Sequence, residues 1–262
     1  MSKVIVIIGA SSGIGKTTLT KLMAQDNKVY NLSRSKIERL KTNIYCDVSR
    51  VDTVKYAIDE VIKKEKKIDA LIYCAGFSMA SPIEEVKEDD YRYLYDVILF
   101  GYIETIKSVI PIFKINNGGR VIFLSSIASH IPIPYDPYYS SAKASVEVFN
   151  NGVSLELNKY NIYLTNLIFG GVKTNFTYKR KVYDEKVESN NFYNSVYGLA
   201  QIEQTGKDSE DIAKAIIKIL KCDKPPLNYV VGFKDKVKYN LSKVFPKKFI
   251  NQFVKLKFKL KN

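Results

Sequence analysis

The sequence is poor in the residues that carry many kinds of chemistry. It holds one histidine, His130, and three cysteines among 262 residues. Three cysteines without the spacing of metal ligands indicate a reduced, cytoplasmic compartment, and we expect no metal site. A Ser-His-Asp hydrolase would need His130, but the Gly-x-Ser-x-Gly of a nucleophile elbow is missing. We therefore expect His130 at the surface or at the rim of a pocket.

Long apolar runs are also missing. None approaches the roughly 18 residues of a membrane-spanning helix, and the run Val4–Ile8 is too short for a signal peptide. The length of 262 residues and a hydrophobic fraction of 46% suffice for a sizeable core. Because repeats and linkers are absent, we expect a single domain over residues 1–235, followed by a tail over residues 236–262.

Acidic residues are absent from this tail, which contains nine lysines. The tail therefore carries most of the net charge of +14, and nucleic-acid binding is a poor interpretation for the rest of the chain. Apolar residues alternate with the lysines, so the tail is basic and amphipathic. One hypothesis is peripheral contact with an anionic membrane. The other is docking on its own domain or on a partner subunit, with the lysines in water.

Strand-like and helix-like segments alternate along the chain. Strands are predicted at residues 4–8, 29–32, 43–46, 70–74, 121–125, 162–169 and 229–231, and helices at 17–26, 51–62, about 88–114, 137–159 and 209–221. This alternation predicts an α/β fold with a doubly wound parallel sheet of about seven strands. Ligands bind such sheets at the carboxyl ends of the strands. The motifs at these ends should therefore meet in one crevice.

A glycine-rich turn follows the first predicted strand. Residues 13–17 read Gly-Ile-Gly-Lys-Thr, which resembles the end of a nucleotide-triphosphate loop. That motif needs a glycine five positions before Gly15, where this chain has Ala10. The spacing of Gly9, Gly13 and Gly15 instead favours a dinucleotide turn, in which a pyrophosphate lies at a helix N-terminus.

Arg34 lies just after the second predicted strand, where the adenosine ribose of a dinucleotide should lie. An acid at this place would accept a hydrogen bond from a ribose 2′-hydroxyl, whereas a guanidinium would bind a 2′-phosphate. Arg34 therefore favours NADP(H) over NAD, unless it is simply a solvated surface arginine. Asp47, after the third strand, could accept from the adenine amino group or cap a helix, a role for which Ser49 and Asp52 compete.

Tyr139 and Lys143 are separated by one turn of a predicted helix, and Ser126 precedes Tyr139 by thirteen residues. A free tyrosine titrates near 10. A lysine ammonium and a nicotinamide cation nearby would lower that pKa, so Tyr139 could exchange a proton with a carbonyl or alcohol oxygen. Ser126, preferred to Ser125 from the spacing, would orient the substrate. In isolation, the tyrosine and lysine would be an ordinary exposed pair; Tyr138 is the natural control.

With these motifs the sequence resembles the short-chain dehydrogenase/reductase family over roughly residues 3–232. The resemblance implies a Rossmann-like domain, a nicotinamide cofactor, and Ser126, Tyr139 and Lys143 as the catalytic residues. It also implies a homodimer or homotetramer formed through the helices near 88–114 and 137–159. The cofactor site that we assign comprises Gly9, Ser11, Ser12, Gly13, Ile14, Gly15, Ser33, Arg34, Asp47, Val48, Ala75, Gly76, Tyr139, Lys143, Val172 and Thr174.

Three positions depart from the family pattern. Ile98 replaces an asparagine that is thought to hold a water linking the lysine to solvent, Phe169 stands where proline is common, and Cys74 replaces an asparagine. Our leading hypothesis is an NADP(H)-dependent oxidoreductase that interconverts a carbonyl and an alcohol. The alternative, which Ile98 supports, is a catalytically impaired NADP(H)-binding regulator or scaffold.

Residues 175–204 are expected to form a mobile lid over the substrate. The lid is rich in aromatic residues, namely Phe176, Tyr178, Tyr183, Phe192, Tyr193 and Tyr197. They indicate either a hydrophobic, lipid-like substrate or packing of the lid itself. Lys179, Arg180 and Lys181 could attract an anionic substrate or form a solvated face.

Overall fold

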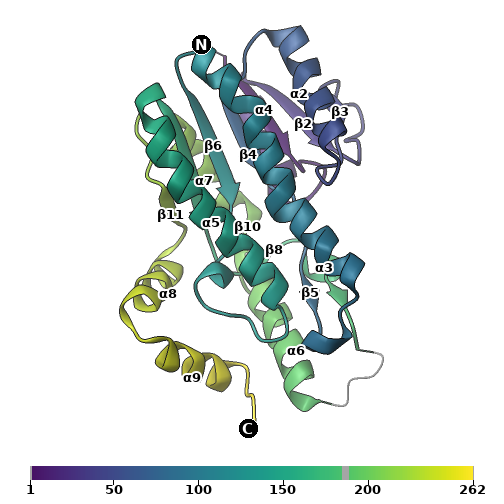
Figure 1. Ribbon diagram of the computed structural model, residues 1–262, viewed down its shortest axis with the longest axis vertical. Coiled ribbons are helices and arrows are strands. Elements are labelled where there is room, and N and C mark those ends of the chain that lie inside the picture. Colours follow the sequence, from purple (N-terminus) through teal and green to yellow (C-terminus); the bar gives the residue numbers. More distant parts are fainter. Residues whose placement is uncertain (1, 185–188, 262) are drawn as a thin grey trace.

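The computed structural model, which describes residues 2–184 and 189–261, contains a seven-stranded parallel sheet (Figure 1). The strand order β11-β7-β6-β4-β1-β2-β3 reverses direction at β1, as in a doubly wound fold. The strands of this sheet are β1 (Val4–Ile8), β2 (Lys28–Ser33), β3 (Asn43–Tyr45), β4 (Ala70–Tyr73), β6 (Gly119–Leu124), β7 (Ile162–Ile168) and β11 (Asn228–Val230). The predicted fold class is therefore confirmed.

Four very short strands form two further parallel pairs. They are β8 (Val172–Lys173) with β10 (Lys207–Asp208), and β5 (Met79–Ala80) with β9 (Lys181–Val182). Short 3-10 helices lie at Ile83–Glu85, Ile127–Ser129, Asn158–Tyr160 and Thr177–Lys179. The pairing of β5 with β9 ties the expected lid to the segment after β4.

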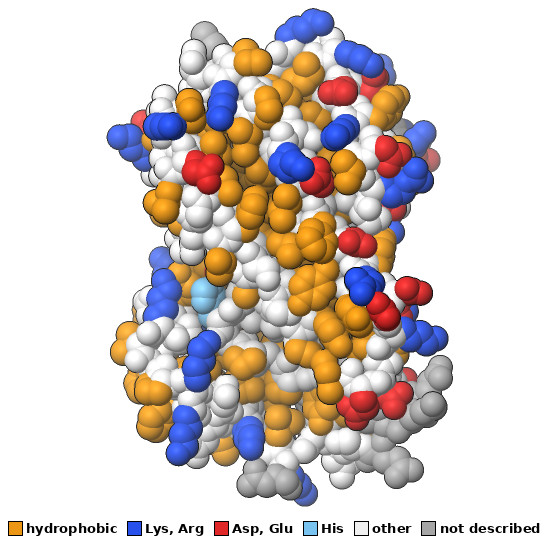
Figure 2. Space-filling model, viewed as in Figure 1, with side chains coloured by type: hydrophobic (Ala, Val, Ile, Leu, Met, Phe, Trp, Pro, Cys, Tyr) orange, Lys and Arg blue, Asp and Glu red, His pale blue; other side chains and the backbone are white. Residues whose placement is uncertain are grey.

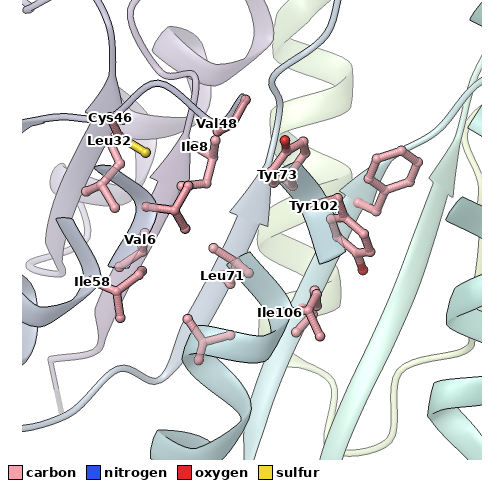
Figure 3. Close-up of a cluster of buried hydrophobic side chains, with 14 of the residues drawn as sticks. Val6, Ile8, Leu32, Cys46, Val48, Ile58, Leu71, Tyr73, Tyr102 and Ile106 are labelled. Atoms are coloured by element: carbon pink, nitrogen blue, oxygen red, sulfur yellow. The ribbon is translucent and has the colours of Figure 1, made fainter. Parts of the chain in front are cut away.

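The continuous apolar sequence of β1 follows from its burial on both faces. Its side chains alternate between two hydrophobic clusters, one on each side of the sheet. Val6 and Ile8 join Leu71, Tyr73 and Tyr102 on one side (Figure 3). Helices α2, α4 and α5 cover this side, whereas α1 and α7 cover the other.

The helices are α1 (Gly13–Met23), α2 (Val51–Glu65), α3 (Glu88–Tyr95), α4 (Gly101–Ile115), α5 (Pro137–Leu157), α6 (Asn190–Gln204), α7 (Ser209–Lys221), α8 (Phe233–Val244) and α9 (Lys247–Lys257). Most predicted bounds are correct within about two residues, but α1 begins four residues earlier than expected because Ser12 is its N-cap. A π-helical segment, Asp96–Phe100, interrupts the long helix predicted near 88–114. Ile98 lies within this segment, and π-bulges are frequent at functional sites.

The C-terminal residues form two helices, and the boundary predicted at residue 235 falls inside the first of them. In Figure 1, α8 and α9 lie at the lower left of the molecule. Val254 and Phe258 pack against Leu199 of α6 and against Ile131 and Ile133. One face of α9 is therefore docked on the domain. In the part of the chain that the structure describes, no helix has the length and apolar character needed to cross a bilayer.

Candidate functional site

The carboxyl ends of the central strands open onto a cavity of about 700 Å³. All the residues assigned to the cofactor and catalytic sites from the sequence line this cavity. They come from the turns after β1, β2, β3, β4, β6 and β7 and from α5. The convergence expected for a parallel sheet is therefore present.

The glycine turn is shaped to receive a phosphate group. Gly9 has a φ of +84°, a backbone conformation that a residue with a Cβ adopts at a cost. A Cβ on Gly15 would collide with the backbone of Gly9 and Ala10, so this glycine lets α1 pack closely on β1. Ser12 caps α1 without a side-chain hydrogen bond to the helix. The first N–H groups of α1 are thus available to an anion, and the turn fits a dinucleotide pyrophosphate.

Arg34 is exposed, and its guanidinium donates a hydrogen bond to the hydroxyl of Tyr93. Tyr93, from α3, was not found from the sequence because nothing in the local pattern connects α3 with the turn after β2. Asp47 accepts hydrogen bonds through Oδ1 from the backbone N–H and the hydroxyl of Ser49, at 3.1 and 2.7 Å. The N-cap of α2 is Arg50, so the predictions that Asp47, Ser49 or Asp52 caps this helix are wrong.

Ser126 follows β6 and caps the short helix Ile127–Ser129, accepting a hydrogen bond of 3.1 Å from the backbone N–H of Ala128. Burial raises the pKa of Tyr139 well above its ordinary value, and Asp136 raises it further, whereas a hydrogen bond with Ser126 opposes the rise. Burial therefore outweighs the lowering of this pKa that we expected from the lysine. The protein alone holds Tyr139 protonated at neutral pH.

Lys143 lies one turn after Tyr139 and is buried. Its ammonium lies 5.6 Å from the centre of the Tyr139 ring and 4.4 Å from that of Phe123. Burial lowers the pKa of Lys143 to about 7. The pair is thus not the ordinary exposed one. By contrast, Tyr138 stacks on Tyr91 with ring centres 5.2 Å apart and is absent from the cavity wall.

The rival serine and the histidine belong to another hydrogen-bond network. The hydroxyl of Ser125 donates to the Glu147 carboxylate. His130 is half-buried, with Nε2 lying 2.8 Å from Oε2 of Glu147 and the ring meeting Tyr239 of α8 edge to face. The side chain of His130 is 21% exposed and visible at the surface in Figure 2, as expected, and it also links α5 to α8.

The expected lid is anchored to the domain wherever the structure describes it; residues 185–188 lie outside the described residues. Arg180 is buried, and its guanidinium lies 2.6 Å from Glu203 of α6 and donates to Ser78 at 2.8 Å. Lys181 pairs with Asp90 at 2.5 Å. For the buried Arg180, both predictions, a solvated face and a free attractant for anions, are wrong. Lys181 is 48% exposed and lies on a solvated face, but its ion pair with Asp90 means that it is not a free attractant for anions.

Four of the six aromatic residues of the lid fall into three groups: one lines the cavity, one is buried and two are exposed. Phe176 lines the cavity, with its ring centre 5.8 Å from that of Tyr139. Phe192 is fully buried against Tyr135, so it packs the lid down. Tyr178 and Tyr197 are exposed.

Sequence reasoning missed three acids of the cavity wall, namely Asp136, Glu203 and Asp90, which pairs with Lys181. Asp136 is buried directly before α5, and burial raises the pKa of its carboxyl to about 8. Neither carboxylate oxygen has a partner of good hydrogen-bond geometry among the described residues, although the backbone N–H groups of Met79 and Tyr139 are close enough to moderate the rise. Glu203 is the second acid. Only the Asp-Pro pair that begins α5 could have indicated Asp136 as a buried helix start.

Of the three departures from the family pattern, Phe169 and Cys74 line the cavity. Ile98 is fully buried. Its side chain and the Lys143 ammonium approach the same side of Gly76, 3.5 and 3.6 Å from the point where a Cβ would lie. An apolar side chain therefore borders the lysine.

Comparison with known proteins agrees with this geometry. A 3-ketodihydrosphingosine reductase of Bacteroides thetaiotaomicron is 28% identical over 236 residues, covering 88% of each chain. A probable short-chain type dehydrogenase/reductase, VdlC, of Helicobacter pylori is 26% identical over 266 residues, covering 96% of each chain.

Solved structures share the fold. A short-chain dehydrogenase from Streptomyces avermitilis superimposes with a TM-score of 0.83 at 22% identity, with both chains fully covered. A short chain dehydrogenase from Burkholderia cenocepacia, solved in complex with NADP, gives a TM-score of 0.77 at 19% identity, covering 96% and 97% of the two chains. Residues 3–184 match the profile of the family described as short chain dehydrogenase. This chain therefore belongs to the short-chain dehydrogenase/reductase family of NAD(P)-binding oxidoreductases.

Proposed function

We propose that the protein is an NADP(H)-dependent reductase that converts a carbonyl of a hydrophobic substrate to an alcohol. The observation that carries this proposal is the presence of Ser126, Tyr139 and Lys143 in one cavity with the glycine turn. A phosphate cradle and a proton donor on the same wall are the two parts that a nicotinamide-dependent reduction needs.

The protonated state of Tyr139 at neutral pH suits the reductive direction. A nicotinamide supplies the hydride when it is bound. Tyr139, protonated at neutral pH, gives its proton to the carbonyl oxygen as negative charge develops there. Ser126 donates a hydrogen bond to the same oxygen and fixes its position. Lys143 hydrogen-bonds the cofactor ribose and, when charged, stabilises the tyrosinate that remains.

Arg34 supports NADP(H) as the preferred cofactor. Its guanidinium is exposed at the cavity wall, and Tyr93 holds it near the end of β2. A 2′-phosphate there would receive charge-assisted hydrogen bonds. Calorimetric titration of the purified protein with NADPH and NADH tests the cofactor site. Tight binding of NADPH supports the proposal, whereas failure to bind either nucleotide overturns it.

The remaining cavity wall supports a hydrophobic, lipid-like substrate. Phe176 from the lid, Ile131 and Ile133 from the segment before α5, and Phe253 and Phe258 near the C-terminus all line it. Apolar and aromatic side chains in a pocket wall favour apolar ligands, although charged side chains such as Asp136 and Glu203 line this cavity as well. The Bacteroides relative, whose name describes it as a 3-ketodihydrosphingosine reductase, is consistent with such a substrate.

The alternative is a catalytically impaired NADP(H)-binding regulator. Ile98 is its only support, since an isoleucine side chain cannot hold a relay water. The presence of Ser126, Tyr139 and Lys143 together in the cavity wall speaks against it. The Bacteroides relative, whose name describes a reductase, does not favour it either.

We also propose that the C-terminal helices contact an anionic membrane surface. While Val254 packs inward, Val244, Phe249 and Leu256 are 79%, 59% and 73% exposed. The nine lysines of residues 236–262 surround these side chains without a single acid. Figure 2 shows basic and hydrophobic side chains together at the lower left, over α8 and α9. An apolar stripe flanked by lysines suits the headgroup region of an anionic bilayer. The cytoplasmic location stays a prediction.

Vesicle sedimentation tests this contact. The variant Phe249→Ser/Leu256→Ser should lose binding to vesicles that contain phosphatidylserine, whereas Tyr56→Ser/Ile83→Ser, with similarly exposed apolar side chains elsewhere, should retain it. Equal binding by both variants would contradict the proposal.

A homodimer or homotetramer through α4 and α5 is a separate proposal. Hydrophobic side chains gather on the face that these helices form (Figure 2), and Val148 and Leu155 are exposed. Light scattering would test it.

A further inference from the structure

A lysine of the lid reaches the glycine turn from a distant part of the sequence. Nζ of Lys179 lies 3.5 Å from Oγ of Ser12. Lys179 ends the 3-10 helix Thr177–Lys179, and Ser12 is the N-cap of α1. Both residues line the cavity. The lysine therefore faces the part of the turn where a pyrophosphate would lie.

The neighbours of Lys179 hold this part of the lid in place. Thr177 donates to Glu203 at 2.5 Å, and the Arg180 guanidinium lies 2.6 Å from the other oxygen of the same carboxylate. Arg180 also donates to Ser78 at 2.8 Å. Since the residues on both sides are tied to the domain, the backbone of Lys179 is positioned beside the turn, and only its side chain has to adjust to a ligand.

Lys179 differs by its partner from two other lysines of the cavity wall. Lys181 pairs with Asp90, and Lys238 lies 3.0 Å from Asp235. Among residues 2–184 and 189–261, no carboxylate forms an ion pair with Lys179; its hydrogen-bond partner is the Ser12 hydroxyl. Its charge is therefore available to an anionic ligand.

We infer that Lys179 binds the pyrophosphate of the dinucleotide and thereby joins the lid to the cofactor. The inference rests on the proposed NADP(H) site. The N–H groups at the start of α1 approach the pyrophosphate from the domain, and the lysine approaches it from the lid. Phe176, three residues before Lys179, contacts Tyr139 in the substrate region. A bound pyrophosphate thus stabilises the part of the lid that carries Phe176 and lines the substrate region. By thermodynamic linkage, substrate and cofactor then each increase the affinity of the protein for the other.

Calorimetry with cofactor fragments tests the contact without turnover. The ligands are 2′-phospho-ADP-ribose, which contains the pyrophosphate, and adenosine 2′-phosphate, which lacks it. For Lys179→Met, the Kd of the first ligand should rise about tenfold and that of the second should stay unchanged. The salt dependence of the first Kd should also weaken. The control Lys173→Met removes an exposed lysine that lies 3.8 Å from Asp208, and it should change neither Kd.

An unchanged Kd for 2′-phospho-ADP-ribose in Lys179→Met would overturn the inference. So would equal losses for the two ligands, because such losses would indicate a distorted lid. If the wild-type protein binds neither fragment nor NADPH, the proposed cofactor site itself fails. These results are distinguishable, since only the last one concerns the wild-type protein.

Discussion

The ammonium of Lys143 donates a hydrogen bond of 2.6 Å to the carbonyl oxygen of Leu124, the last residue of β6. A neutral carbonyl is thus its direct partner, and no carboxylate forms an ion pair with it in the described part of the chain. Glu147, one turn further along α5, supports the charge from a distance, but burial dominates and lowers the pKa to about 7. Lys143 is therefore held in place at a cost in stability.

Lys143→Met should therefore stabilise the fold, and more at pH 7 than at pH 10. The folded pKa of about 7 lies below the ordinary value of 10.5. Between these values the unfolded chain holds the proton more tightly, so the stability of the wild type falls as pH decreases from 10 to 7. Urea unfolding should give a gain that is larger by about 2 kcal/mol at pH 7 than at pH 10. A pH-independent difference would contradict this account.

Asp136 has the opposite linkage. Its folded pKa of about 8 lies above the ordinary value, because burial and nearby Glu203 outweigh the attraction of Arg180. The contribution of this carboxyl to the free energy of unfolding is fully present below about pH 4 and is lost as the pH rises through 8. The stability of Asp136→Asn relative to that of the wild type should thus rise by about 2 kcal/mol as the pH increases from 5 to 8. Urea unfolding at the two pH values measures it, and a gain at pH 5 as large as that at pH 8 would refute it.

Arg34 is expected to set the cofactor preference. Arg34→Ala should raise the Kd of NADPH by about 10- to 100-fold, since a charge-assisted pair with the 2′-phosphate is lost, and should change the Kd of NADH less than about threefold. Arg39→Ala, an exposed arginine of the same loop, is the control. If Arg34→Ala raises the Kd of NADPH and that of NADH by the same factor, the arginine does not bind the 2′-phosphate.

Local patterns predicted much of the fold and site. The run Val4–Ile8 indicated a buried strand because both of its faces are covered, and the four-residue spacing of Tyr139 and Lys143 placed both on one helix. The ion pair of Arg180 with Glu203 could not be predicted, because its residues belong to separate segments, and a charge run looks the same in sequence whether buried or solvated. For the tail, the sequence predicted a basic amphipathic segment, but neither its two helices nor the place of Val254 in the cavity wall.

The central claim is that this cavity reduces a carbonyl with Tyr139 as the proton donor. The most direct measurement is NADPH oxidation over a panel of long-chain ketones and aldehydes by wild type, Tyr139→Phe and Tyr138→Phe. Turnover should fall about 100- to 10,000-fold in Tyr139→Phe, with NADPH binding retained, and stay near wild type in Tyr138→Phe. Turnover that survives in Tyr139→Phe, or NADPH binding without turnover of any carbonyl by the wild type, would contradict the account; the second result would favour the regulator.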